Sequence, residues 1–303
     1  MASNVSNILG RMGLYGAKTV FDSYTPQDLS KTPTEVVIES MLLGQESYDL
    51  VKKQTALLNL SRLNTVLTED AITYDETRGP KFANMMSRLL SLDFIKKGQN
   101  VTMFGRSGAG KSTVAKIIGR KACMAGYTTL YYSTSDMLAM LSTVTGSQMY
   151  TSRLKNLCGK MLLILDDFCL TGYNLEEQKI LFDVFNRRYS NRSTIIISQK
   201  TPDEWHDTME GSSLAESIVD RASNNNFVLT LNGDSRRTSL DDGKPKKQDK
   251  KDDQKDAKDA GEPQAAPAAE PDTEGATPLM RELIMQRATA SAAEAAARDA
   301  QSK

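Results

Sequence analysis

The sequence predicts an α/β fold built on a parallel five-stranded sheet with helices on both faces. The first indication is a glycine-rich turn, GRSGAGKS at residues 105–112, between an apolar strand-like run and a helical pattern. The second is a series of four more apolar runs at residues 128–134, 161–168, 193–199 and 226–232, separated by helical patterns. Such alternation is typical of a parallel sheet whose ligand site lies at the carboxyl ends of its strands.

The glycine-rich turn matches the phosphate-loop pattern G-x-x-x-x-G-K-[ST]. Gly108 and Gly110 allow backbone N–H groups to close around a phosphate at the amino-terminal end of a helix. Lys111 can reach the β- and γ-phosphates, and the Ser112 hydroxyl can bind Mg²⁺. We expect the nucleotide to bind these residues: Gly105, Arg106, Ser107, Gly108, Ala109, Gly110, Lys111, Ser112 and Thr113.

Polar residues at the ends of the later strands complete the predicted site. Asp166 and Asp167 end the third strand, where the first can hold Mg²⁺ through its water shell and the second can orient or deprotonate a water. Ser198 or Gln199, at the end of the fourth strand, could touch the γ-phosphate or that water. Arg221 lies on a helical pattern just before the fifth strand, and an arginine supplied to a neighbouring subunit's γ-phosphate stabilises transition-state charge.

Residues 1–66 predict a small helical domain that precedes the nucleotide-binding domain, residues 67–239. Thr34 can cap a helix, and a second helix is expected over residues 48–63. Tyr74, in a turn-rich connector, is either a contact for the nucleotide base or a packing side chain.

Composition changes after the fifth strand. Residues 240–276 are rich in Lys, Asp, Ala and Pro, which predicts a disordered linker, and residues 277–303 predict a last helix and tail. Net charge is zero; 14 acidic and 11 basic residues fall after residue 239, which leaves a surplus of three basic residues before it. That surplus is compatible with a nucleic-acid partner but too small to indicate one. The three cysteines lack metal-ligand spacing, and two lie in or beside apolar runs, so we expect buried thiols in a reducing cytosol. No apolar run approaches ~18 residues, so we expect a soluble cytoplasmic protein with no membrane contact.

The phosphate loop and the segments LLILDDF, STIIISQKTPDEW, LAESIVDR and LNGDSRR together resemble the IstB-type ATPases. These AAA+ proteins help insertion-sequence transposases and are related to the DnaC helicase loader. The resemblance implies a P-loop NTPase of AAA+ type. No helical C-terminal lid domain is expected after the fifth strand, a departure that the IstB and DnaC groups tolerate. The resemblance also implies an ATP-dependent homo-oligomer that wraps duplex DNA and recruits a transposase.

By position, the resemblance implies Lys111 and Ser112 for ATP and Mg²⁺ and Asp166 with Asp167 as the acidic pair. The same comparison makes Ser198 or Gln199 the first sensor, Arg221 the arginine finger and Arg237 a second sensor-like arginine. The sequence departs from most AAA+ proteins at Asp167, where Glu is usual, and this leaves the hydrolysis rate open.

Two alternatives stay open at this stage, and a third is disfavoured. A DnaC-like loader of a replicative helicase would use the same mechanics with another partner. A scaffold that binds nucleotide with little turnover is left open by Asp167. A small-molecule kinase would need an arginine-rich lid over the phosphates, and the sequence offers no such segment.

Overall fold

The computed structural model describes residues 4–63, 65–74 and 78–231. Those residues divide into two compact units, residues 4–51 and residues 52–231, and the division falls inside one long helix. The predicted end of the N-terminal domain is residue 66. Arg237, the linker, the last helix and the question of a lid domain all lie outside the described residues.

The N-terminal unit is helical. Its elements are α1 (Asn4–Arg11), α2 (Tyr15–Ser23), α3 (Pro26–Lys31) and the first part of α4 (Thr34–Leu60). The prediction of two helices over residues 34–63 was wrong, because α4 is continuous.

Helices α2 and α4 approach each other closely at two glycines. A Cβ atom on Gly44 would lie 2.4 Å from Val20 Cγ2, and one on Gly16 would lie 2.3 Å from the Gly44 carbonyl oxygen. The Gln45 side chain accepts hydrogen bonds from the backbone N–H groups of Gly16 (3.0 Å) and Ala17 (3.3 Å) at the start of α2. Gly44 therefore serves packing in this unit and does not interrupt α4.

The second unit contains the predicted parallel sheet. Its strands are β1 (Asn100–Phe104), β2 (Thr129–Ser133), β3 (Leu162–Phe168), β4 (Ser193–Ser198) and β5 (Asn226–Thr230). All neighbouring strands are parallel, in the order β2-β3-β4-β1-β5. Each strand lies within a few residues of its predicted position, so the sheet prediction is confirmed.

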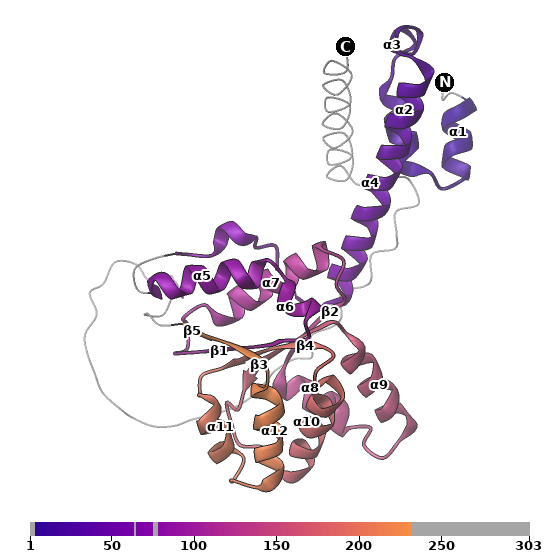
Figure 1. Ribbon diagram of the computed structural model, residues 1–303. Helices are drawn as coiled ribbons and strands as arrows, with labels where there is room; N and C mark the ends of the chain where they lie inside the picture. Colours follow the sequence, from indigo (N-terminus) through magenta and orange to yellow (C-terminus); the bar gives the residue numbers. More distant parts are fainter. Residues whose placement is uncertain (1–3, 64, 75–77, 232–303) are drawn as a thin grey trace, which may run out of the picture. The chain divides into compact units, whose positions relative to one another are not determined.

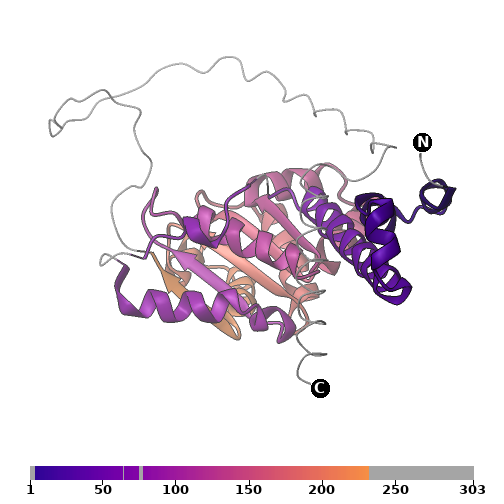
Figure 2. The same cartoon turned by 90° about the horizontal axis from the view of Figure 1, so that it is seen from above.

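Helices cover both faces of this sheet (Figures 1 and 2). One face carries α5 (Gly79–Leu90), α6 (Asp93–Lys96) and α7 (Lys111–Met124); a short turn of helix, η1 (Glu69–Ala71), precedes them in the chain. The other face carries α8 (Thr134–Ser142), α9 (Gln148–Gly159), α10 (Leu175–Arg188), α11 (Pro202–Thr208) and α12 (Ser213–Ser223). Of these, α9 and α11 were not predicted. Within the described residues, no helix is both long and apolar enough to cross a membrane.

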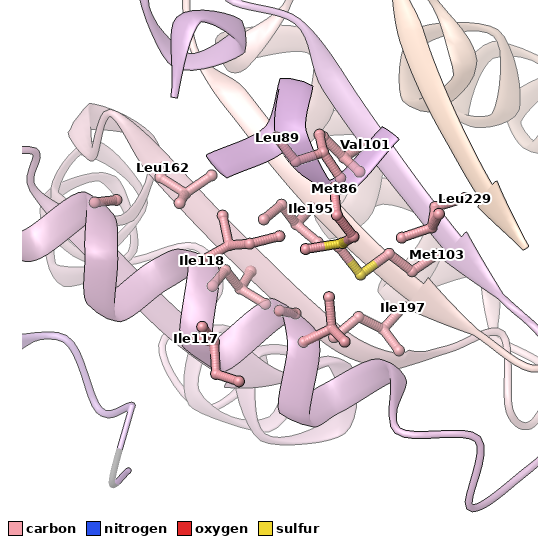
Figure 3. Packing of buried hydrophobic residues seen from close by; sticks show 14 of the residues in the cluster. Met86, Leu89, Val101, Met103, Ile117, Ile118, Leu162, Ile195, Ile197 and Leu229 are labelled. Carbon is pink, nitrogen blue, oxygen red and sulfur yellow. The ribbon is translucent and has the colours of Figure 1, made fainter. Parts of the chain in front are cut away.

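Alternate residues of the buried strands feed two apolar cores. Ile195 and Ile197 of β4 face α5 and α7, whereas Ile196 faces the other helical layer. Figure 3 shows the first core, in which Met86 from α5 and Ile118 from α7 point toward the strands. A strand with both faces covered reads as a continuous apolar run, which is why the sequence located these strands well. The three cysteines are buried as predicted.

The contact between α2 and α4 predicts that two glycine substitutions differ in their effect on stability. Gly44→Ala should lower the free energy of unfolding of the N-terminal unit by about 1–2 kcal/mol. The destabilisation from overpacking exceeds the stabilisation from the higher helix propensity of alanine. Gly10→Ala is the matched control, since its Cβ would meet only the flexible Lys18 side chain at 3.7 Å. Hydrogen exchange of the α2 and α4 amides measures both. Equal protection in the two variants would contradict the packing role of Gly44.

Candidate functional site

A pocket at the carboxyl ends of β1, β3 and β4 brings together most of the predicted site residues. Its lining comes from the phosphate loop, the acidic pair and the end of β4: Ser107, Gly108, Gly110, Lys111, Ser112, Thr113, Asp166, Asp167, Ile197, Ser198 and Gln199. β4 lies between β1 and β3, and the strands are parallel, so their carboxyl ends meet at one edge of the sheet. The order of the strands therefore places these predicted residues side by side, and their binding roles stay predictions.

The phosphate loop leaves β1 at Phe104 and enters α7 at Lys111. Gly108 (φ 81°) and Gly110 (φ 86°) have left-handed backbones that favour glycine. The Lys111 ammonium group is buried and donates to the carbonyl oxygens of Gly105 (2.7 Å) and Arg106 (2.9 Å). The loop thus holds its cation against its own backbone, at the amino-terminal end of α7, where an anion is favoured.

Gly105 is required for a different reason. A Cβ atom there would lie 2.1 Å from the Leu231 carbonyl oxygen, and its φ of 144° lies outside the range that other residues favour. Gly105, Arg106 and Ala109 do not line the pocket themselves. The Ala109 carbonyl oxygen accepts a hydrogen bond from the Arg78 guanidinium (3.3 Å), a contact that the sequence did not indicate.

Asp166 and Asp167 are adjacent in β3 and yet both line the pocket. Adjacent residues of a regular strand point to opposite faces. Here the pairing of β3 with β4 shifts register between Leu165 and Phe168, and Asp167 has a left-handed backbone with φ 54°. The irregularity explains how a buried carboxylate and an exposed one share a single site.

Asp166 is held by several hydrogen bonds. Its Oδ2 accepts from the Tyr131 hydroxyl (2.6 Å), and its Oδ1 accepts from the Asp167 backbone N–H (2.9 Å). Its carbonyl oxygen accepts from the Thr134 hydroxyl (2.8 Å). Tyr131 and Thr134 were missed, because only the order of strands in the sheet places β2 beside β3.

Ser198 already uses its hydrogen-bonding capacity inside the fold. Its hydroxyl donates to the Phe168 carbonyl oxygen (2.7 Å) and accepts from the Trp205 indole N–H (3.0 Å) and the Lys200 backbone N–H (3.1 Å). A hydroxyl offers one donor and two acceptor sites, so all three are occupied. Between the two sensor candidates, we therefore keep the exposed Gln199 as the proposed contact for the γ-phosphate.

Arg221 lies away from the pocket. It is in the last turn of α12, where its guanidinium donates to Asn186 Oδ1 (3.3 Å) and the Ser217 carbonyl oxygen (2.9 Å) and stacks over the Phe182 ring. The Asn100 side chain, at the start of β1, donates to the Arg221 carbonyl oxygen (3.2 Å). Arg221 is thus placed at the amino-terminal edge of the sheet, opposite the phosphate loop.

Tyr74 does not line the pocket either. Its side chain is exposed, and its ring lies 5.7 Å from the ring of Phe82. A contact between Tyr74 and the nucleotide base stays a prediction.

Comparisons with known proteins relate this chain to ATP-binding proteins of insertion sequences. A model of the family of IstB-like ATP binding proteins matches residues 8–242. An insertion sequence ATP-binding protein of Sinorhizobium fredii, y4uH, is 30% identical over 238 residues, which cover 76% of this chain and 93% of the relative. The insertion sequence IS5376 ATP-binding protein of Geobacillus stearothermophilus is 29% identical over 208 residues, covering 66% of this chain and 82% of the relative. Among solved structures, the DnaC helicase loader aligns with a TM-score of 0.45 at 20% identity, covering 58% of this chain and 98% of that one.

The position of Asp167 in this pocket generates a prediction about turnover. Asp167→Asn should bind ATP as the unchanged protein does but hydrolyse it on the order of 10²-fold more slowly, because the amide cannot accept the proton of the attacking water. A coupled ATPase assay and equilibrium binding of a fluorescent ATP analogue measure the two quantities. Asp207→Asn, a change at an exposed carboxylate outside the pocket, is the control. Unchanged turnover in Asp167→Asn would assign the base elsewhere or favour a scaffold.

Proposed function

Because this chain belongs to the IstB-like family of P-loop ATPases, we propose that it assembles on duplex DNA as an ATP-dependent homo-oligomer and assists a transposase. The insertion-sequence relatives favour this role over the loading of a replicative helicase. The observation that carries the proposal is the separation of Arg221 from the phosphate pocket. A subunit with this arrangement has the phosphate loop and acidic pair at one edge and the candidate finger at the other.

The pocket residues fit Mg²⁺ bound with ATP. Ser112 offers a hydroxyl and Asp166 a buried carboxylate at the same pocket wall, and oxygen donors of this kind suit Mg²⁺. When bound, the ion would neutralise charge on the β- and γ-phosphates. Lys111 would release the carbonyl oxygens of the loop and donate to phosphate oxygens, Asp167 would accept a proton from the attacking water, and Gln199 would hold that water or the γ-phosphate.

Arg221 would complete a neighbour's site. At the opposite edge of the sheet its guanidinium cannot contact the nucleotide of its own subunit, so a catalytic role requires a second subunit. Exchange of the contacts to Asn186 and Ser217 for contacts to a γ-phosphate would link hydrolysis to assembly. A finger of this type contributes about 10³-fold or more to turnover.

A basic groove supports the DNA part of the proposal. Two hollows that share Asn156 lie along β2 and α9. Their cationic lining residues are Arg62, Arg153, Lys155 and Lys160, and none of the described lining residues is acidic. The Arg62 guanidinium stacks over the Tyr132 ring at 4.5 Å, which holds it at the surface of the groove. Cations placed in this way suit the phosphates of a nucleic-acid backbone.

Charge reversal in the basic groove tests the DNA contact. Lys155→Glu with Lys160→Glu should weaken binding to duplex DNA at least about tenfold and lower the salt slope by about two, because each lost phosphate contact removes about 0.9 from that slope. Fluorescence anisotropy over a series of KCl concentrations measures both. Lys97→Glu with Lys179→Glu, an equal change of net charge elsewhere, is the control. If both double variants weakened DNA binding equally, the groove would not be the DNA-binding surface. If the unchanged protein did not bind duplex DNA, the proposed DNA-binding function would be wrong.

Mixing two inactive variants tests whether Arg221 acts between subunits. Arg221→Ala should bind ATP but hydrolyse it poorly, and Lys111→Ala should lose tight ATP binding. In a mixture, an Arg221→Ala subunit with an intact loop can meet an Arg221 from a Lys111→Ala subunit, so turnover should return to a fraction set by random assembly. Titration of one variant with the other in an ATPase assay measures this. A mixture as inactive as its components at every ratio would contradict the proposed oligomeric site.

A further inference from the structure

The phenol of Tyr131 is in direct contact with the carboxylate of Asp166. Its hydroxyl lies 2.6 Å from Asp166 Oδ2, while Oδ1 accepts from the Asp167 backbone N–H at 2.9 Å. Asp166 is only 4% exposed. Each oxygen of this buried carboxylate therefore has a fixed donor, and the plane of the carboxylate is set by two groups from different parts of the chain.

The register of the sheet determines which side chain of β2 reaches Asp166. Ser133 pairs with Asp166 and Tyr131 with Ile164, so the Tyr131 ring spans two residues toward the carboxyl end of β3. Diagonal neighbours on one face of a sheet are within reach of an aromatic side chain. A smaller residue at position 131 could not make this contact.

The ring of Tyr131 is also held in place by α7, the helix that follows the phosphate loop. The Lys116 ammonium group lies 4.7 Å from the ring centroid, and the ring packs against the core that α7 shares with the sheet. Lys116 is in the second turn of α7, the helix that begins at the phosphate-loop lysine. Tyr131, in β2, thus contacts both Lys116 of α7 and Asp166 of β3.

The phenol and the carboxylate each have a property that suits this contact. A phenol hydroxyl is a hydrogen-bond donor at neutral pH, and the Tyr131 hydroxyl donates to Asp166 Oδ2. A carboxylate oxygen has two lone pairs, so a donor on Oδ2 leaves room for a water bound to a metal ion.

We propose that Tyr131 is a positioning residue that orients the Asp166 carboxylate for Mg²⁺ and thereby sets the Mg²⁺ affinity of the ATP-bound protein. The proposal rests on the Mg²⁺-binding role assigned above to Asp166. Groups that hold a metal ligand in place are worth about 10- to 100-fold in metal affinity or activity. Loss of the phenol oxygen should therefore act on the metal and leave the contacts of the phosphate loop with the nucleotide unchanged.

Tyr131→Phe tests this with the ring and its contact to Lys116 retained. The Mg²⁺ concentration that half-saturates the ATP-bound protein should rise on the order of tenfold, and ATP affinity in EDTA should stay the same. Equilibrium binding of a fluorescent ATP analogue across a Mg²⁺ series gives both values. Mn²⁺ binding to the ATP complex, followed by electron paramagnetic resonance, gives a second readout that does not depend on turnover.

A second tyrosine–aspartate pair in the same domain provides the matched control. The Tyr150 hydroxyl donates to Asp183 Oδ2 at 2.7 Å, a contact between α9 and α10 away from the pocket. Tyr150→Phe should lower the melting temperature about as much as Tyr131→Phe does, without any change in Mg²⁺ dependence.

Each outcome bears on the proposal. A raised Mg²⁺ requirement in Tyr131→Phe alone supports it. If Tyr131→Phe needs the same Mg²⁺ concentration as the unchanged protein, or a lower one, the proposal about Tyr131 is wrong, but the Mg²⁺ role of Asp166 is not affected. The same holds if the ATP affinity of Tyr131→Phe falls equally with and without Mg²⁺. ATP binding by the unchanged protein that is independent of Mg²⁺ would overturn both the proposal and the metal role of Asp166.

Discussion

All groups of the nucleotide site depend on the common direction of β1, β3 and β4. The loop after β1, the acidic pair of β3 and the polar residues of β4 are far apart in the chain, and only parallel pairing brings their carboxyl ends together. That pairing requires strands buried on both faces, since helices cross from one strand to the next. At the opposite edge, the buried Arg188 donates to the carbonyl oxygens of Cys158 (3.1 Å), Lys160 (2.8 Å) and Ser193, which joins the starts of β3 and β4.

The sequence predicted best where one physical cause dominates. Strands buried on both faces appear as apolar runs, and their positions were right to within a few residues. Helices α9 and α11 were missed because their apolar positions are few and no strong periodicity marks them. The break expected between two N-terminal helices was wrong, because the sequence cannot show that Gly44 is used for close packing and that α4 continues through it.

At the site, contiguous motifs were predictable and contacts across strands were not. The phosphate loop works through neighbours in sequence, so its residues could be named in advance. Tyr131 reaches Asp166 only because β2 is next to β3, an order that the sequence alone does not determine. Ser198 shows the converse: it ends a strand and lines the pocket as predicted, but the sequence could not show that its hydroxyl is engaged by Phe168, Lys200 and Trp205.

The aspartate at position 167 fits the backbone that it occupies. The register shift that turns residue 167 toward the pocket gives it φ 54°, a conformation that Asp adopts more readily than most residues because its short polar side chain can bond locally. A glutamate would extend further toward the γ-phosphate but would have to be held in the same left-handed conformation. The irregular backbone of β3 at residue 167 therefore favours aspartate over the longer glutamate at this position. In the proposed mechanism, its effect on turnover depends on how closely Asp167, Gln199 and a neighbour's Arg221 approach the attacking water.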